Sequence, residues 1–167
     1  MNPDFVWLEL HGGLWHTTHP ERFRRILVHG AIIPEPDIPE SDRWKTSNGP
    51  ECYPYVRTLG GISLFDFDNF DLKTYSEQYP LSSWDYFVPY RKDWGCAVWI
   101  EIDRERVAKH LVSAAALVAR WHDEKAFRHT IMPYLEAAYI GELPRTAFVR
   151  AFVVREGEQS CHPVGIT

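Results

Sequence analysis

The chain has 167 residues, of which 45% are hydrophobic and 25% charged, proportions that are ordinary for a folded globular domain. This composition argues against an intrinsically disordered chain, and we expect a single domain over residues 1–167. The 18 Lys and Arg against 23 Asp and Glu give a formal net charge of -5, which argues against non-specific coating of DNA or RNA. An enzyme that meets nucleic acid through a local patch stays compatible with this charge.

The cysteines and the apolar runs indicate in which cellular compartment the protein lies. Cys52, Cys96 and Cys161 are odd in number and none is spaced as a CxxC pair, so we expect neither a disulfide framework nor a zinc knuckle. The first ten residues lack a basic start followed by a long apolar run, and no run approaches the ~18 apolar residues of a membrane span. We therefore expect a cytoplasmic protein without a signal peptide or a membrane span.

The first elements follow from residues 5–33. Segments 5–10 and 14–18 are rich in apolar and aromatic residues and flank a glycine-containing turn at 11–13, as extended segments would. Pro20 predicts the start of a short helix, and Gly30 predicts its end because a left-handed residue is needed there. The residues at helical spacing that would form its inner face are Phe23, Ile26 and Leu27.

The middle of the chain alternates between loop and strand signals. Five prolines predict a loop over 34–60, and a loop of this length tends to be functional or mobile. Segment 61–67 is expected to be a strand, and a short helix is expected around Trp84 within the weakly periodic stretch 66–95. Segment 95–103 is predicted to be a strand that is half-buried by alternation.

The last third of the chain completes the fold class. We expect one helix over 104–123, a strand over 135–140, a second strand over 147–156 and an irregular tail over 157–167. Several strands with few helices between them indicate an α+β domain.

Common catalytic motifs are absent from the sequence. There is no HExxH, no paired Cys/His set, no GxSxG, no P-loop and no GxGxxG, so we expect neither a metal site, a serine hydrolase nor a classical nucleotide-binding motif. His16 and His19 are three apart, but they fall on different predicted elements. The densest basic cluster consists of Arg22, Arg24 and Arg25, and we interpret it as the solvated face of the first helix.

Three segments carry more information together than each does alone. The first is Leu14-Trp15-His16-Thr17-Thr18 with the helix and Gly30-Ala-Ile-Ile-Pro that follow; the second is Gly61-Ile-Ser-Leu-Phe65; the third runs from Ile131 through Glu136 to Leu143-Pro144. This ordered set resembles the ADP-ribosyltransferase superfamily, nearest its DNA-targeting toxins, over roughly residues 14–154. The resemblance implies an α+β fold of two small packed β-sheets with peripheral helices, and NAD as co-substrate without a metal.

The resemblance also implies roles for particular residues. Glu136 and His16 would be catalytic, with Glu136 stabilising the positive charge that develops on the ribose when the nicotinamide bond breaks. The residues expected to bind NAD are His16, Thr17, Thr18, Ser63, Phe65 and Arg57. Phe65, or one of Tyr53 and Tyr55, would stack on nicotinamide, and either Arg43 or Arg57 would bind the diphosphate.

Two glutamates compete for the catalytic position. The apolar surroundings of Glu136 favour it, because a buried carboxylate is costly without a partner or a purpose. Glu142 adjoins Leu143-Pro144 and is the alternative, although the spacing of Glu136 to Pro144 fits the family better.

The function that these expectations favour is ADP-ribosyl transfer from NAD to a macromolecule, nucleic acid or protein, by a bacterial toxin or defence effector with an antitoxin protein as a further partner. A small-molecule acceptor stays open. The alternatives are an NAD glycohydrolase, with water as acceptor, a non-catalytic module that binds NAD, ADP-ribose or nucleic acid, and a structural or interaction protein without a ligand.

Overall fold

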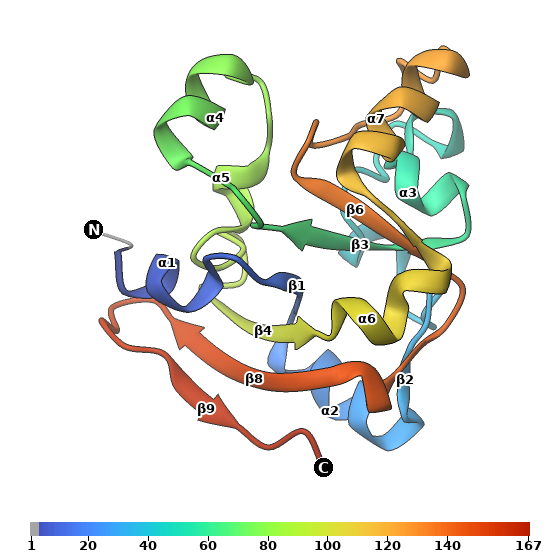
Figure 1. Ribbon diagram of the computed structural model, residues 1–167. Helices are drawn as coiled ribbons and strands as arrows, with labels where there is room; N and C mark the ends of the chain where they lie inside the picture. The colour runs from blue at the N-terminus through green and yellow to red at the C-terminus, as the bar shows by residue number, and fades with distance from the viewer. Residues whose placement is uncertain (1–3) are drawn as a thin grey trace.

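The computed structural model describes residues 4–167, in which strands alternate with short helices (Figure 1). The strands are β1 (Leu14–Thr18), β2 (Ala31–Ile32), β3 (Gly61–Asp66), β4 (Cys96–Ile102), β5 (Leu111–Val112), β6 (Glu136–Ile140), β7 (Leu143–Pro144), β8 (Phe148–Arg155) and β9 (His162–Val164). The α-helices are α1 (Asp4–Leu10), α2 (Pro20–His29), α3 (Tyr55–Thr58), α4 (Leu72–Gln78), α5 (Trp84–Phe87), α6 (Arg104–Val107) and α7 (Ala114–Asp123). The α+β class predicted from the sequence is confirmed.

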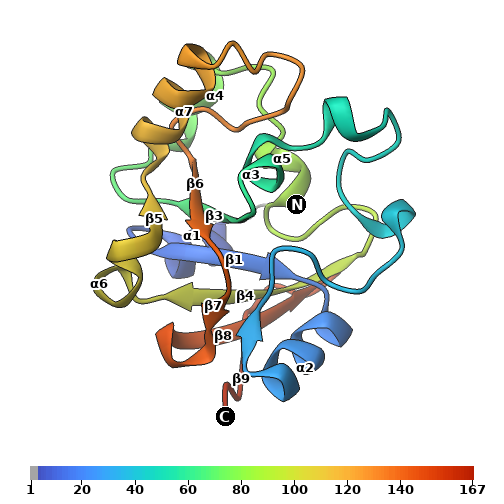
Figure 2. The same ribbon diagram turned by 90° about the vertical axis from the view of Figure 1, so that its right-hand side faces the viewer.

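One antiparallel sheet of seven strands, in the order β5-β6-β3-β1-β4-β8-β9, organises the described residues. β1 pairs with β4 over residues 15–18, but with β3 only at Leu14 and Trp15. The strands β1 and β3 therefore separate after Trp15 and leave a fork in the sheet. β2 and β7 form a separate two-stranded ribbon, which Figure 2 shows with α2 beside β2. The expected pair of small sheets is thus met only in part, because the strands are divided very unequally.

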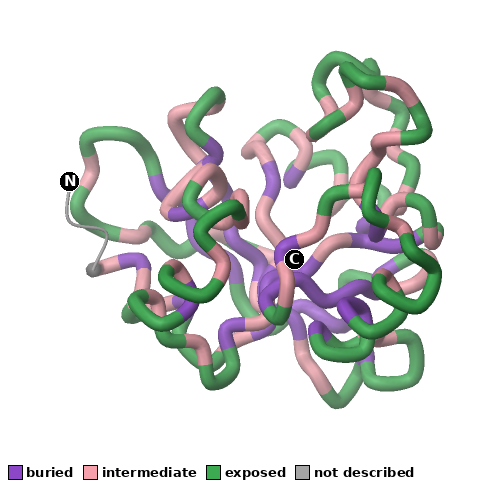
Figure 3. Tube along the Cα trace, turned by 90° about the horizontal axis from the view of Figure 1, so that it is seen from above, coloured by how far each residue is buried: buried purple, intermediate pink, exposed green. Residues whose placement is uncertain are grey.

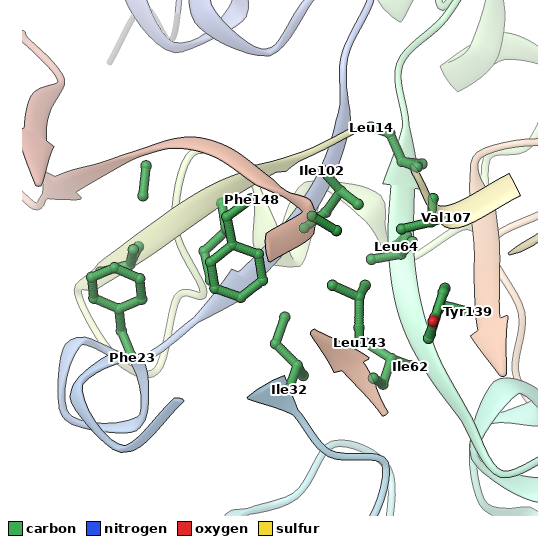
Figure 4. Packing of buried hydrophobic residues seen from close by; sticks show 14 of the residues in the cluster. Leu14, Phe23, Ile32, Ile62, Leu64, Ile102, Val107, Tyr139, Leu143 and Phe148 are labelled. Atoms are coloured by element: carbon green, nitrogen blue, oxygen red, sulfur yellow. The ribbon is translucent and has the colours of Figure 1, made fainter. Parts of the chain in front are cut away.

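Apolar clusters cover both faces of the large sheet. Alternate residues of β4 point to opposite faces, so Val98 and Ile100 join one cluster while Ala97 and Trp99 join the other. Figure 4 shows the first cluster, in which Phe23 of α2 lies among side chains from the sheet and the ribbon. Buried residues follow the central strands, and exposed ones follow the outer loops (Figure 3). The strand predicted over 95–103 is confirmed as β4, but the expectation that it is half-buried is wrong, because β4 lies between two neighbours and is covered on both faces.

The first predicted helix is confirmed as α2. Pro20 is its first residue, and the ring of His19 caps it by accepting a hydrogen bond from the Glu21 amide. Gly30 ends it at φ 85°, a left-handed conformation that suits glycine, and donates its N–H to the carbonyl of Ile26. The chain then enters β2 in the extended conformation expected for it.

The segment 5–10 forms α1 and not the extended chain expected. Val6 and Leu10 are four residues apart and both fully buried, which is the spacing of one helix face, while Leu8 between them is 83% exposed. The ring of Trp7 packs against that of Phe70, with the ring centroids 5.5 Å apart, beside the same apolar cluster as Val6 and Leu10. The expectation of extended chain is wrong because the buried residues repeat with the period of a helix and not with that of a strand.

The single helix expected over 104–123 is broken into α6, a 3-10 turn, β5 and α7. β5 pairs with β6 at the edge of the sheet, through Leu111 with Tyr139 and Val112 with Ala138. Ser113 then starts α7, because its hydroxyl accepts a hydrogen bond from the Ala116 amide. Pairing with a distant strand therefore overrides the local helical preference of this stretch.

Three further segments contain regular structure that the sequence predicts only in part. The short helix expected around Trp84 is α5, whereas α4 was not foreseen. The tail expected to be irregular contains β9, which pairs with β8. The loop 34–60 carries α3 near its end together with short 3-10 turns. Among the described residues, no helix has the length and apolar character to cross a membrane.

Candidate functional site

A pocket of about 560 Å³ lies at the fork between β1 and β3. Its walls come from β1, α2, the loop after β2, β3, the segment around α5 and the residues that lead into β6. The residues that the sequence favours as catalytic or NAD-binding all line it, namely His16, Thr17, Thr18, Arg57, Ser63, Phe65 and Glu136. The structure therefore gathers into one cavity residues that lie up to 120 positions apart in the sequence.

Glu136 is the first residue of β6 and is 5% exposed. One carboxylate oxygen, Oε1, accepts a hydrogen bond of 2.6 Å from the Ser63 hydroxyl, and Oε2 accepts one of 3.0 Å from the Met132 amide. Burial raises the pKa of Glu136, while these two hydrogen bonds oppose the rise because they favour the charged form. Glu142, the competing candidate, is exposed and does not line the pocket.

His16 reaches across the fork from β1. Its Nδ1 lies 3.1 Å from the Ser63 carbonyl oxygen, which can only accept, so Nδ1 carries the hydrogen. Burial lowers the pKa of His16, which favours the neutral ring. In that form Nε2 keeps its lone pair and can accept a hydrogen bond from a ligand hydroxyl.

The two threonines lie at the end of β1, beyond the last residue that pairs with β3. Thr18 is 5% exposed, and the Oγ1 atom of Thr17 is buried without a hydrogen-bond partner among the described residues. β1 has no β3 partner here, so one backbone edge of this segment is open on the pocket side. Unmatched polar groups of this kind suit a site that completes its hydrogen bonds with a ligand.

The aromatic wall differs from the one expected. Phe65 lines the pocket but is only 3% exposed, and its ring packs edge-to-face on Trp99 at 5.3 Å, so it is also a core residue. Tyr53 and Tyr55, the other stacking candidates, do not line the pocket. The aromatic side chains that join Phe65 there are Trp44, Phe87 and Trp94. The sequence does not predict these three as pocket residues, because nothing in their local pattern separates them from core aromatics.

Arg43 and Arg57, the candidates for the diphosphate, are both engaged by glutamates of their own loop. Arg57 lies 2.9 Å from Glu35 and 2.7 Å from Glu40, and Arg43 pairs with the same Glu35. The guanidinium of Arg57 lowers the pKa of Glu40 to about 2, so these carboxylates stay charged at neutral pH. We name these four side chains the loop clasp. Arg57 lines the pocket as expected, but its charge is balanced within the clasp.

Two arginines of α2 carry the positive charge that lacks such a partner. Arg22 and Arg25 line the pocket three residues apart, and neither forms a salt bridge within the described residues. Burial and the neighbouring Arg91 lower the pKa of Arg22, while the charge of Asp42 opposes this shift. The Asp42 backbone carbonyl also accepts a hydrogen bond of 3.0 Å from Arg22. Arg91 itself is neutralised by Asp93, through two hydrogen bonds of 2.8 Å.

The interpretation of the basic cluster as a solvated face is confirmed for Arg24 and Arg25, which are exposed, but Arg25 also lines the pocket, as does the partly buried Arg22. Their spacing of three on a helix whose inner face is buried is the signal that could have identified them.

The pocket thus combines a buried carboxylate, a neutral histidine acceptor, aromatic rings and two guanidinium groups that form no salt bridge among the described residues. This set suits a ligand that has phosphates, sugar hydroxyls and flat rings. In the part of the chain that the structure describes, no group of three or more His, Cys, Asp or Glu is placed to hold a metal ion. Comparisons with models of protein families, with curated proteins and with solved structures find no match for this chain.

Proposed function

We propose that this protein is an NAD-dependent ADP-ribosyltransferase that modifies a macromolecule, nucleic acid or protein. The observation that carries the proposal is the contact of both His16 and Glu136 with one residue, Ser63, inside a single pocket. A carboxylate and a histidine acceptor that face the same cavity match the two demands of the reaction, which are a cation to stabilise and a ribose to hold. The role of a bacterial toxin or defence effector belongs to the same proposal.

In this reaction the bond between nicotinamide and C1′ of the ribose breaks, and its electron pair leaves with nicotinamide. The ribose becomes oxocarbenium-like, and the charged Glu136 lowers the energy of that state because the site is desolvated. A lone pair of the acceptor then forms a bond to C1′, and the acceptor proton passes to the Glu136 carboxylate. Ser63 and Met132 hold the two carboxylate oxygens during these steps.

The remaining contacts suit the rest of NAD. Nε2 of His16 accepts a hydrogen bond from a ribose hydroxyl, and the open backbone edge at Thr17 can bind the carboxamide of nicotinamide. Arg22 and Arg25 are best suited to the diphosphate, because they line the pocket and form no salt bridge among the described residues. A pocket of about 560 Å³ lies in the ordinary range for binding sites of small ligands and cofactors.

The decisive experiment incubates the protein with NAD labelled on the adenine side, in separate pools of DNA, RNA and protein. Label in one pool with the parent protein, and none with Glu136→Gln, would support transfer and identify the acceptor. Release of free ADP-ribose in the absence of any acceptor would instead favour NAD glycohydrolase activity at the same site. NAD binding without turnover would favour a non-catalytic binding module. Intact NAD with neither binding nor label would overturn the proposal.

A further inference from the structure

We infer that Tyr75 is a positioning residue for Glu136, acting through the turn that leads into β6. Tyr75 lies in α4, outside the pocket and 6% exposed, and its hydroxyl donates a hydrogen bond of 2.7 Å to the Pro133 carbonyl. Figure 1 shows α4 and the segment before β6 at the same end of the molecule. This inference rests on the proposed function for its catalytic consequence, and on geometry alone for its effect on Glu136.

The turn at 132–136 connects Pro133 to the carboxylate. Its amides at Leu135 and Glu136 both donate to the Met132 carbonyl, at 3.3 and 2.9 Å. The Met132 amide in turn donates to Oε2 of Glu136. The position of this donor therefore depends on the turn keeping its shape.

The turn contains a backbone conformation that needs support. Tyr134 has φ 57°, in the left-handed region that side chains other than glycine rarely adopt, and it is 55% exposed. Such a conformation persists where the surrounding contacts fix it. Tyr75 supplies one of those contacts at the adjacent residue, Pro133, from an element more than fifty positions earlier in the chain.

The Tyr75 hydroxyl is itself well placed for this task. Ser82 lies 3.1 Å from it and can donate, since the phenol hydrogen is used toward Pro133. Burial and the nearby charge of Glu136 raise the pKa of Tyr75 to about 12, so the phenol stays neutral and remains a donor at physiological pH. Tyr75 therefore acts on the Glu136 carboxylate only through the turn, because Tyr75 itself does not line the pocket.

The test is Tyr75→Phe, which removes one hydroxyl and keeps the ring. Loss of the anchor lets the Met132 amide drift from Glu136, and this raises the pKa of the carboxyl further, because a hydrogen bond to its charged form is weakened. We expect the acid limb of the kcat profile to move to higher pH and kcat at neutral pH to fall roughly tenfold. KM for NAD should change less than about twofold, because Tyr75 does not line the pocket.

Tyr79→Phe is the matched control. Tyr79 follows one turn later, its ring lies 4.9 Å from that of Tyr75, and its hydroxyl has no hydrogen-bond partner in the described chain. This variant should keep the parent pH profile. A Tyr75→Phe profile that superimposes on the parent would overturn the inference, as would a Tyr75→Phe protein that fails to fold, since the hydroxyl would then serve the fold at large.

A second measurement separates this inference from the proposed function. The carboxyl carbon of Glu136, followed by NMR in labelled protein without NAD, reports its titration directly. A higher midpoint in Tyr75→Phe than in the parent supports the positioning role even in a protein that turns over no NAD. Equal midpoints refute the role even in a protein that is an active transferase.

Discussion

The hydroxyl of Ser63 donates a hydrogen bond of 2.6 Å to Oε1 of Glu136. Through its backbone carbonyl, the same residue accepts a hydrogen bond from the ring of His16. One serine in β3 thus fixes the carboxylate on one side of the fork and the imidazole on the other. The orientation of both groups depends on the place of β3 between β6 and β1.

Replacing Ser63 by Ala tests this arrangement. The variant keeps the carbonyl that His16 contacts but loses the hydroxyl, so only Glu136 is left with an unmatched oxygen. We expect the pKa of Glu136 to rise and transferase turnover at neutral pH to fall roughly ten- to hundredfold. The measurement is the pH dependence of kcat, and Ser63→Thr, which keeps a hydroxyl, should recover part of the loss. Equal activity in Ser63→Ala and the parent would exclude this role.

Glu136→Gln should change how stability depends on pH. The folded pKa of Glu136 is raised above its ordinary value of 4.5, so the unfolded state loses its proton first. The parent therefore loses stability as pH rises above 4.5, until the folded carboxyl also ionises. Gln cannot ionise and can still accept from the Met132 amide and donate to Ser63.

As pH rises above 4.5, the free energy of unfolding of Glu136→Gln should therefore increase relative to that of the parent. This change should level off once the folded carboxyl has ionised. Urea denaturation at a series of pH values measures it. A constant difference between the two proteins at all pH values would contradict the raised pKa.

His16 predicts a pH dependence of NAD binding. Its folded pKa is below the ordinary value of 6.5, so the ring is neutral at pH 7 and becomes charged only in more acid solution. A charged ring has no lone pair on Nε2 and can no longer accept from a ribose hydroxyl. We expect NAD affinity to be flat above pH 6.5 and to fall as His16 protonates.

Calorimetric titration in the Glu136→Gln background isolates this effect, since that protein neither titrates at 136 nor consumes NAD. His16→Ala in the same background should bind NAD several-fold more weakly at pH 7. It should also lose the decline of affinity in acid. A decline that persists without His16 would assign it to another group.

The arginines of α2 and of the loop clasp should respond differently to substitution. Arg25→Ala removes an exposed charge that lines the pocket, and we expect NAD to bind roughly tenfold more weakly. Arg24→Ala is the matched control, because Arg24 is also exposed but does not line the pocket. Arg57→Ala leaves Glu35 and Glu40 with one cation fewer and should loosen the loop.

Hydrogen exchange over residues 34–57 should therefore rise in Arg57→Ala, with a smaller loss of NAD affinity than in Arg25→Ala. Binding assays with all three variants compare them directly. A larger loss of NAD affinity in Arg57→Ala than in Arg25→Ala would indicate that Arg57, and not Arg25, binds the diphosphate.

Local signals in the sequence were sufficient for some elements. Pro20 and Gly30 marked the ends of α2, and the apolar run from Gly61 marked β3, because the chemistry that decides these boundaries lies within a few residues. The sequence order of the three motifs also led to His16, Ser63 and Glu136, which the structure brings into one pocket.

Other features depend on partners far along the chain. The break between α6 and α7 exists because Leu111 and Val112 pair with β6, and no local sequence pattern predicts that pairing. We propose Arg22 and Arg25 for the diphosphate in place of Arg57 because Glu35 and Glu40 already pair with Arg57 across the loop. A charge can be counted in a sequence, but whether it is already balanced depends on the folded neighbours.

The fork between β1 and β3 also limits how the pocket can change. Only Leu14 and Trp15 of β1 pair with β3, so the pairing ends at the residue that precedes His16. Because paired strands lie about 4.8 Å apart, one more pair between β1 and β3 would narrow the fork, and one pair fewer would widen it. The register of β1 and β3 therefore sets the width of the pocket at the fork. Residues such as Trp15, which lie outside the pocket, thus contribute to its shape.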